Sequence, residues 1–368
     1  MSSVRRTESP QRPVDRGIGG ASRAVRHNFR APVPYVSDAA HRRRRAAARL
    51  ARSITPPFVV PDLRHTSPSV SSHIALIVNP VAGRGRAAAH AARAESALRA
   101  VASVRRYDTA GAGEERRCAR AACEAGASAL AVVGGDGSVH HAARGLLDTA
   151  RPGSPPDVPL AVFAAGTGND YVKSLGTPSH DARAMAERIA RGHTRVVDVG
   201  LIDDVPFLNA AGLGFDVDVL ERLQRARRLS GTSAYVVTAL RALLGYRGYQ
   251  ATLHGEHSKQ VGPHLLTVFA NGGTFGGTFR IAPHASLDDG ALALVNIHAL
   301  PAVRRPGVFF RATRGTHLTH RDVTHGRGTQ WRITSDAPLR FEADGELYTS
   351  RHPEIAVGVR ARALRVIA

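Results

Sequence analysis

The sequence predicts an α/β protein with two folded domains, an N-terminal doubly wound parallel sheet and a C-terminal domain that is mainly antiparallel β. Three observations support this prediction. Short apolar runs alternate with helix-like runs from residue 73 onward, which is typical of a parallel sheet covered by helices. After Asp198 the pattern changes to short alternating segments separated by Gly, Pro and Asp. The 368 residues also exceed the roughly 100–200 residues of a usual domain.

The first folded domain is expected over residues 73–196, because one unit of strand, turn and helix repeats along it. An apolar run ends in Asn79 and Pro80 and leads through Gly83 into an Ala- and Arg-rich helix. Strands are expected at 74–78, 104–109, 129–133 and 160–163, and helices at 87–102, 114–125 and 138–147. A helix between successive strands makes those strands parallel.

The second folded domain is expected over residues 197–350, where short alternating segments favour antiparallel β structure. Strands are expected at 265–270, 291–297, 330–334 and 339–343. Helices are also compatible with the sequence at 217–228, 234–244 and 303–314.

Residues 1–72 are predicted to form a mostly disordered basic tail, apart from a short helix at 41–53. They contain 14 Arg and 4 acidic residues, which gives +10, half of the formal net charge of +20. We favour a solvated extension over an anchor to anionic lipids, to which each arginine would contribute about 1 kcal/mol. Because the folded part is only moderately basic and aromatic residues make up 5% of the chain, no nucleic-acid partner is expected.

The cysteines and the apolar runs indicate in which cellular compartment the protein is expected. Cys118 and Cys123 are the only cysteines, and their spacing fits neither a zinc site nor a disulfide framework, which favours a reducing cytoplasm. No run of roughly 18 apolar residues occurs, so the sequence predicts no membrane-spanning segment and no ordinary signal peptide.

A glycine-rich turn at residues 134–138, called the glycine turn below, is the first candidate for chemistry. Gly134, Gly135, Asp136, Gly137 and Ser138 lie between an apolar run and an expected helix. Glycines bring backbone N–H groups close to phosphate oxygens, and a helix N-terminus favours anions. We therefore interpret the glycine turn as a nucleotide site rather than a plain strand-to-helix turn. Asp136 could hold a cation, orient a donor or fix the turn through backbone N–H groups.

Two further small-residue turns follow strands of the same domain. Residues 79–83 follow the first expected strand, and residues 165–170 follow the fourth. Ligands bind at the carboxyl edge of open parallel sheets, so the three turns together predict one cleft. Neither a Walker lysine motif nor a Rossmann glycine fingerprint is present.

In order and spacing, these motifs resemble the diacylglycerol kinase catalytic-domain family, which includes bacterial lipid kinases and the sphingosine kinases. The second half of the chain adds matching motifs, and the resemblance runs from about residue 73 to the C-terminus. They are Asn209 to Asp216, Asn271-Gly272 with Gly276-Gly277, Ala282-Pro283 with Leu287 to Gly290, and Ala343-Asp344-Gly345-Glu346.

This resemblance implies a nucleotide-binding first domain and a β-rich lipid-substrate domain with the active cleft between them, and a return of residues 351–368 to the first domain. The implied cofactors are ATP and Mg²⁺. The implied ATP site consists of Asn79, Pro80, Val81, Ala82, Gly83, Thr109, Gly134, Gly135, Asp136, Gly137, Ser138, Val139, His140, His141 and Thr167.

The resemblance also implies a metal site and a catalytic pair. In the bacterial branch of the family, the loop that corresponds to residues 287–290 binds Mg²⁺. That site maps onto the Asp289 carboxylate and the backbone carbonyls of Ser286 and Ala291. Asp344 and Glu346 fall on the catalytic Asp-Gly-Glu, with Glu346 as the proton acceptor.

The chemistry of phosphoryl transfer agrees with these assignments. A lipid hydroxyl is a poor nucleophile, so a carboxylate must take its proton as the γ-phosphoryl group passes across. The phosphates need Mg²⁺, carried on ATP, and basic side chains such as Arg84. Two positions depart from the family: Ser138 stands where Thr is usual, and His141 stands where Glu is common.

The favoured hypothesis is a lipid kinase that acts as a peripheral protein at the cytoplasmic face of the cell membrane. One alternative is an NAD kinase, which shares the glycine-rich Asp motif. Another is a non-catalytic binder of nucleic acid or anionic surfaces with a kinase-like fold, which the +20 charge and His141 would suit. The motifs do not name the lipid, and the oligomeric state, a homodimer included, is open.

Overall fold

The structure is a computed structural model that describes residues 72–85, 87–111, 113–225, 241–256 and 258–368. All of these residues belong to one compact unit, Ser67–Ala368. The predicted basic tail lies outside the described residues except for its last position, and so does most of the helix expected at 234–244.

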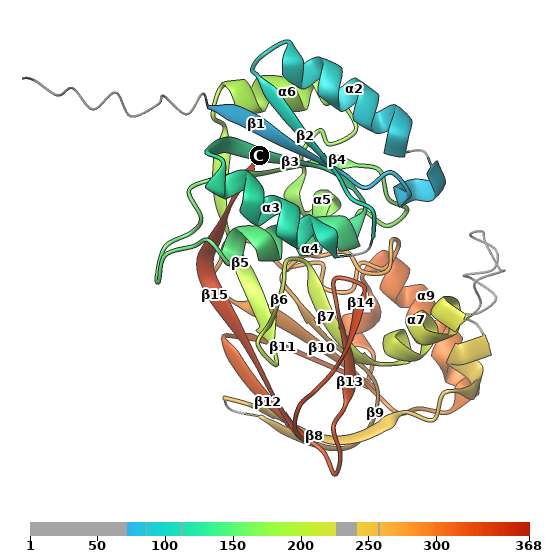
Figure 1. Ribbon diagram of the computed structural model, residues 1–368. Coiled ribbons are helices and arrows are strands. Elements are labelled where there is room, and N and C mark those ends of the chain that lie inside the picture. Colours follow the sequence, from blue (N-terminus) through green and yellow to red (C-terminus); the bar gives the residue numbers. More distant parts are fainter. Residues whose placement is uncertain (1–71, 86, 112, 226–240, 257) are drawn as a thin grey trace, which may run out of the picture. The chain divides into compact units, whose positions relative to one another are not determined.

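Four parallel strands form the sheet of the N-terminal half, in the order β2-β1-β3-β4 (Figure 1). This confirms the parallel sheet expected from the sequence. The elements of this half are β1 His73–Val78, η1 Ala82–Gly85, α2 Ala87–Arg99, β2 Val104–Asp108, α3 Glu114–Glu124, β3 Ala127–Gly134, α4 Asp136–Leu147, β4 Leu160–Ala164, α5 Asp170–Leu175 and α6 Ala182–Ala190.

Helices cover both faces of this parallel sheet, so the half is doubly wound. Along β1, Ala75 and Ile77 join a buried cluster with residues of α3 and α4. Ile74, Leu76 and Val78 point the other way and join a cluster with residues of α2 and α6. All six residues of β1 are buried, because a strand packed on both faces has no polar side.

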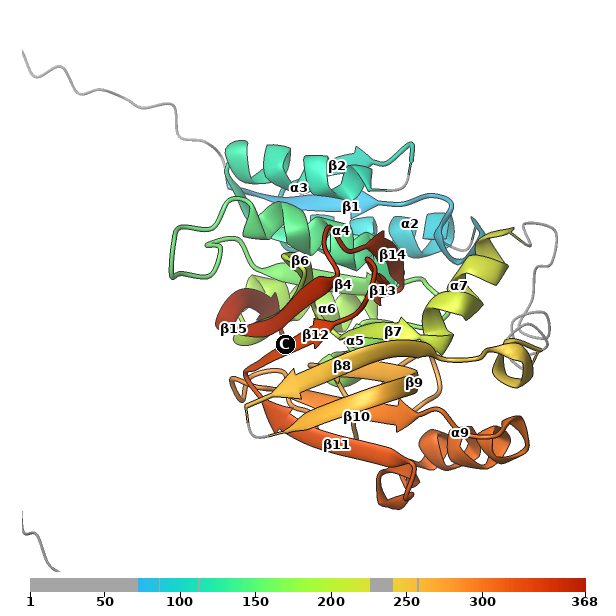
Figure 2. The ribbon, with the colours of Figure 1, turned by 90° about the horizontal axis from the view of Figure 1, so that it is seen from below.

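The C-terminal half is built mainly from antiparallel strands, as the sequence predicts (Figure 2). Its elements are β5 Thr194–Ile202, β6 Val205–Phe207, β7 Ala210–Gly214, α7 Phe215–Arg225, β8 Tyr249–Gly255, β9 Lys259–Ala270, β10 Leu292–His298, η2 Ala302–Arg304, α9 Arg305–Arg314, η3 His317–Thr319, β11 Val323–Gly328, β12 Gln330–Thr334, β13 Arg340–Ala343, β14 Glu346–Thr349 and β15 Glu354–Ile367.

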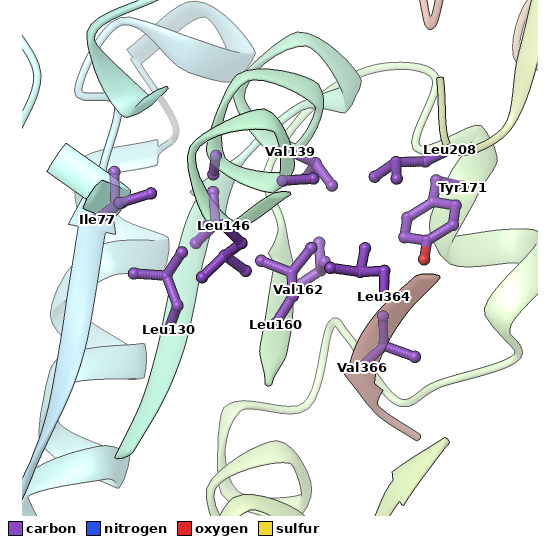
Figure 3. Close-up of a cluster of buried hydrophobic side chains, with 14 of the residues drawn as sticks. Ile77, Leu130, Val139, Leu146, Leu160, Val162, Tyr171, Leu208, Leu364 and Val366 are labelled. Carbon is purple, nitrogen blue, oxygen red and sulfur yellow. The ribbon is translucent and has the colours of Figure 1, made fainter. Parts of the chain in front are cut away.

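Strand β15 connects the two halves within one continuous sheet. It pairs antiparallel with β12 and β5, and at Val366 it lies parallel to Leu160 of β4. Figure 3 shows that Leu364 and Val366 lie among the buried side chains of the N-terminal half, beside Val162 and Tyr171. The last strand of the chain therefore completes the core of the first half.

Two features bear on the site and its setting. Helix α4 begins at Asp136, two residues earlier than expected, so Asp136 is the first helical residue after the glycines of the turn. Within the described ranges, no helix combines the length and the apolar character needed to cross a bilayer.

Candidate active site

Glu346 lies directly against the glycine turn. It follows the turn at Asp344 and Gly345 that joins β13 to β14, where both residues have positive φ values, 52° and 89°. A Cβ placed on Gly137 would meet the Glu346 Oε1 atom at 2.5 Å. The Glu346 side chain is 38% exposed, so its carboxylate is open to a substrate. Residues 137 and 346 come from different halves of the chain, and the structure brings them together.

Two glycines hold the glycine turn against the turn that follows β4. A Cβ on Gly135 would lie 3.2 Å from the Gly166 Cα atom, and a Cβ on Gly166 would lie 2.6 Å from the Gly135 Cα atom. Neither position has room for a side chain. The first turn of α4 therefore keeps its N–H groups at a narrow backbone junction, the arrangement in which a helix N-terminus can bind phosphate.

Asp136 and Asp170 place two carboxylates beside each other at this junction. A Cβ on Gly168 would lie 2.9 Å from the Asp136 Oδ2 atom and 3.7 Å from the Asp170 Oδ2 atom. Burial and the neighbouring Asp170 raise the pKa of Asp136 to about 6. Asp170 accepts hydrogen bonds from the Gly277 N–H at 2.8 Å and from Lys173 Nζ at 3.4 Å. A cation placed here would relieve the repulsion between the two carboxylates.

Asn79 connects the end of β1 to the glycine turn. Its Nδ2 atom donates to the Ser138 Oγ atom and to the Glu115 Oε1 atom, each at 3.0 Å. Glu115 is 1% exposed and was not singled out by the sequence analysis. Its only sequence signal is an acidic residue at the start of an expected helix. Thr109, also buried, donates its N–H to the Val78 carbonyl at 2.9 Å and so lies at the same sheet edge.

Asp344 is buried and bound by protein donors. Its Oδ1 atom accepts the N–H groups of Asn209 at 2.8 Å and Ala210 at 3.3 Å. Its Oδ2 atom accepts the Leu208 N–H at 2.8 Å and lies 3.0 Å from His140 Nδ1. With 4% of the side chain exposed, this carboxylate is placed to hold the turn before Glu346 rather than to touch a substrate.

The two histidines after the glycine turn have different environments. His140 is 1% exposed, and its Nε2 atom lies 2.9 Å from the Tyr348 hydroxyl, so it lies beneath the predicted ATP site. His141 is partly exposed, with its Nε2 atom 3.9 Å from the Glu346 Oε2 atom. Burial and the neighbouring His140 lower the pKa of His141, which favours a neutral ring beside Glu346.

The remaining predicted ATP-site residues divide between surface and core. Val139 is 3% exposed and packs in the core on one face of the parallel sheet, so it has no side-chain access to a ligand. The side chain of Arg84 lies outside what the structure describes. Exposed or half-buried positions at the sheet edge are Pro80, Val81, Ala82, Gly83 and Thr167.

In the loop predicted to bind Mg²⁺, the carboxylates of Asp288 and Asp289 have protein partners. The Asp289 Oδ2 atom pairs with Arg327 Nη2 at 2.8 Å, and its Oδ1 atom accepts the Ala291 N–H at 3.1 Å. The Ser286 hydroxyl donates to Asp288 at 3.0 Å, and Asp288 also pairs with Arg195. The Asp289 carboxylate is therefore already paired with a guanidinium, and a Mg²⁺ ion bound by Ser286, Asp289 and Ala291 would have to displace Arg327; this metal site stays a prediction. Across the described residues, no cluster of three or more His, Cys, Asp or Glu side chains could hold a metal.

Asp198 holds this loop in place and was missed by the sequence analysis. It is fully buried, and its carboxylate accepts the N–H groups of Gly290 at 2.6 Å and Arg362 at 2.7 Å. The sequence offered only an acidic residue in an expected strand, so no local signal could have identified its partners.

A polar cavity of about 230 Å³ lies beside Lys173, the partner of Asp170. It is lined by residues of both halves, including Lys173, Arg195 and Arg280. A larger hollow of about 720 Å³ lies between α2 and α6, and none of the predicted site residues line it.

The two halves of the chain match two known domain families. Residues 73–202 match the diacylglycerol kinase catalytic domain, and residues 209–368 match the YegS C-terminal NAD kinase beta sandwich-like domain. A diacylglycerol kinase of Mycobacterium tuberculosis is 29% identical over 291 residues, covering 77% of this chain and 91% of that protein. A diacylglycerol kinase of Bacillus subtilis is 25% identical over 278 residues, covering 74% of this chain and 88% of that protein.

A solved structure shares the fold. The crystal structure of a diacylglycerol kinase from Bacillus anthracis superposes with a TM-score of 0.61 at 20% identity, covering 81% of this chain and 97% of that one. At this identity the likeness concerns the fold.

Proposed function

Because the chain belongs to the diacylglycerol kinase catalytic-domain family, we propose that it is an ATP-dependent lipid kinase, which transfers the γ-phosphoryl group of ATP to a lipid hydroxyl. The observation that carries the proposal is the position of Glu346. Its carboxylate lies against the first turn of α4, where a Cβ on Gly137 would meet the Oε1 atom at 2.5 Å. A base at the phosphate end of a nucleotide site is what phosphoryl transfer to an alcohol requires.

In the proposed reaction, Glu346 takes the proton of the lipid hydroxyl. The hydroxyl oxygen forms a bond to the γ-phosphorus while the bond from that phosphorus to the β–γ bridging oxygen breaks. ADP leaves with the electron pair of the broken bond, and Glu346 later gives its proton to water. Asp344 and His140 hold the turn that carries Glu346. The Asp344 carboxylate accepts the backbone N–H groups of residues 208–210 at 2.8–3.3 Å and lies 3.0 Å from His140 Nδ1.

The N–H groups at the start of α4 are proposed to bind the phosphates of ATP. Asp136 and Asp170, whose carboxylates both face Gly168, are proposed to hold the Mg²⁺ that arrives with ATP. Such an ion would supply positive charge for the phosphates and would favour the ionised form of Asp136, whose pKa is raised to about 6.

The proposed acceptor is a glycerolipid such as diacylglycerol, the substrate class that the names of the relatives carry. A sphingoid base is the other lipid alcohol to test. Since the acceptor resides in a membrane and ATP in the cytoplasm, we propose a peripheral position at the cytoplasmic face of the membrane.

The test is transfer of labelled phosphate from γ-labelled ATP to diacylglycerol, to sphingosine and, in parallel, to NAD. The full chain is compared with Glu346→Gln and Asp136→Ala, and with Glu354→Gln as the matched control, because Glu354 is an exposed glutamate at the start of β15. We expect a labelled lipid with the wild type and the control, and a rate lower by about 10³-fold or more with Glu346→Gln.

Two outcomes would refute this proposal. Full transfer by Glu346→Gln would remove the base from the mechanism. Transfer of labelled phosphate to NAD, with none to any lipid, would show that the protein is an NAD kinase.

A further inference from the structure

An apolar and arginine-rich surface lies on α9 and on the η2 turn before it, and we call it the α9 face. Its apolar members are Val303, 85% exposed, and Phe310, 57% exposed. Its cationic members are Arg304, Arg311 and Arg314, which are all exposed. Large apolar side chains that cluster at a surface and are bordered by charge mark a contact with a partner.

Phe310, Arg311 and Arg314 lie within the last turns of α9, and Val303 and Arg304 lie on the η2 turn that leads directly into this helix. The Arg314 guanidinium lies 4.1 Å from the centroid of the Phe310 ring. The apolar pair is therefore bordered by guanidinium groups.

The positive charge of the α9 face is not cancelled locally. Between Asp289 and Asp322 the sequence has no acidic residue. Among the residues that the structure describes, Arg304, Arg311 and Arg314 form no ion pair. The arginines of α7 differ, because Arg222 and Arg225 pair with acids one turn earlier on the same helix.

The other side of α9 is fixed to the protein, so the α9 face is presented rigidly. Val308 and Ala312 are buried. The Arg305 guanidinium donates to the Leu243 and Tyr246 carbonyls, each at 2.6 Å, and so joins α9 to the helical residues 241–245. This segment adds Leu244, which is 50% exposed. Three of the six exposed large apolar residues in the described ranges thus lie on these two neighbouring segments.

The α9 face is one loop away from the proposed phosphate site. The Ala312 carbonyl accepts the Arg280 N–H at 2.9 Å, and the Phe279 and Phe309 rings are 5.9 Å apart. On the other side of the same loop, the Gly277 N–H donates to Asp170 at 2.8 Å. Helix α9 is therefore linked through residues 277–280 to the Asp170 carboxylate that we assign to Mg²⁺.

We infer that the α9 face docks this protein on an anionic lipid bilayer. The inference rests on the proposed function, since a lipid acceptor has to be met in its membrane. Guanidinium groups attract anionic head groups, and Val303 and Phe310 enter the interface between head groups and acyl chains. A nucleic acid would satisfy the arginines through its phosphates but would leave Val303 and Phe310 without a partner.

The test is binding of the full chain to vesicles of phosphatidylcholine with roughly a third phosphatidylglycerol, measured by co-sedimentation without ATP. The triple variant Arg304→Gln/Arg311→Gln/Arg314→Gln should bind about a hundredfold more weakly, because each arginine at an anionic surface contributes about a fivefold change in affinity. The double variant Val303→Ser/Phe310→Ser should bind about tenfold more weakly with its charge unchanged.

The matched control is Arg93→Gln/Arg120→Gln/Arg151→Gln, which removes the same charge from exposed arginines of the N-terminal half. It should keep vesicle binding within about twofold of the wild type. Replacement of Arg304, Arg311 and Arg314 by lysine should restore most of the binding. All variants should keep wild-type turnover on a short-chain, water-soluble diacylglycerol.

Equal vesicle binding by the wild type and the α9-face variants would overturn the inference and assign membrane contact to another part of the chain, residues 1–71 included. An equal loss in the control would also overturn it, because net charge alone would then decide binding. Loss of binding to duplex DNA or RNA with vesicle binding intact would replace the membrane by nucleic acid. Vesicle binding is measured without ATP, so its failure is distinct from a failure of phosphoryl transfer.

Discussion

Asp216 and Glu342 form a buried pair of carboxyl groups behind the turn that carries Glu346. Both point at the Cα atom of Gly212, which has no room for a Cβ between them. Among the described residues, neither oxygen of Asp216 has a hydrogen-bond partner, and Glu342 uses only Oε2, which accepts the Gly345 N–H at 2.6 Å. Two unpaired buried carboxylates would repel each other, so the pair has to retain a proton.

The stability of the protein should therefore fall as pH rises through neutrality. Burial raises the pKa of Asp216 to about 7, and burial together with Asp216 raises the pKa of Glu342. Between pH 4 and pH 7 the folded state holds protons that the unfolded state has released, so the free energy of unfolding decreases with pH in that interval.

Glu342→Gln keeps an acceptor for Gly345 and removes one of the two charges. It should raise the free energy of unfolding at pH 8 by ~2 kcal/mol and change it little at pH 5, as measured by urea unfolding. The exposed Asp336→Asn should leave the pH dependence unchanged. A pH dependence in Glu342→Gln identical to that of the wild type would contradict the shared proton.

At the scale of the element, the first turn of α4 has to leave space for β14. Gly137→Ala should favour the helix by propensity, yet its Cβ would meet the Glu346 carboxylate at 2.5 Å. We expect turnover to fall about 100-fold with the thermal midpoint nearly unchanged, because a small displacement of a base is costly. The matched control is Gly326→Ala, where nothing lies within 4 Å. Full turnover in Gly137→Ala would show that Glu346 does not act from this position.

The loop before β10 yields a second prediction at this scale. Because Arg327 pairs with Asp289 at 2.8 Å, the loop should be stable without a divalent ion. Removing Mg²⁺ with EDTA should leave the thermal midpoint of the wild type within about 1 °C, while Arg327→Gln should lower stability by about 1 kcal/mol or less. A marked drop of the wild-type midpoint in EDTA would mean that a metal ion holds the loop instead.

At the scale of the whole described unit, β15 makes the two halves depend on each other. Leu364 and Val366 are fully buried in the core of the N-terminal half, while residues 355–358 of the same strand pair with β12. A strand shared in this way couples the unfolding of both halves.

Val366→Ala should lower the free energy of unfolding by about 2 kcal/mol, and the two halves should still unfold in one transition. Circular dichroism and tryptophan fluorescence followed together would measure this, since Trp331 lies in the C-terminal half. Val261→Ala, at a position that is 69% exposed, should have little effect. Two separate transitions would contradict the coupling through β15.

The sequence by itself determined the parallel half, the antiparallel character of the second half and the positions of the three turns. These features are local, because strand and helix periodicity and glycine turns are set by neighbouring residues. The expected strand at residues 330–334 agrees with β12, and the other expected strands differ from the observed ones mainly at their ends. The strands β5 to β8, β11, β14 and β15 were not among the expected strands.

Only the tertiary structure decided which of the motif residues are exposed at the sheet edge and which are buried. Glu346 and Gly137 are 209 positions apart, and no spacing in the sequence fixes their contact. His140 and Val139 look like neighbours of a nucleotide in the sequence, yet the packing of α4 turns both into the interior. The sequence likewise does not indicate which residues lie against the carboxylates of Asp198, Asp216 and Asp289. Contacts of this kind depend on how whole elements pack, because burial and charge pairing are settled between segments that are distant along the chain.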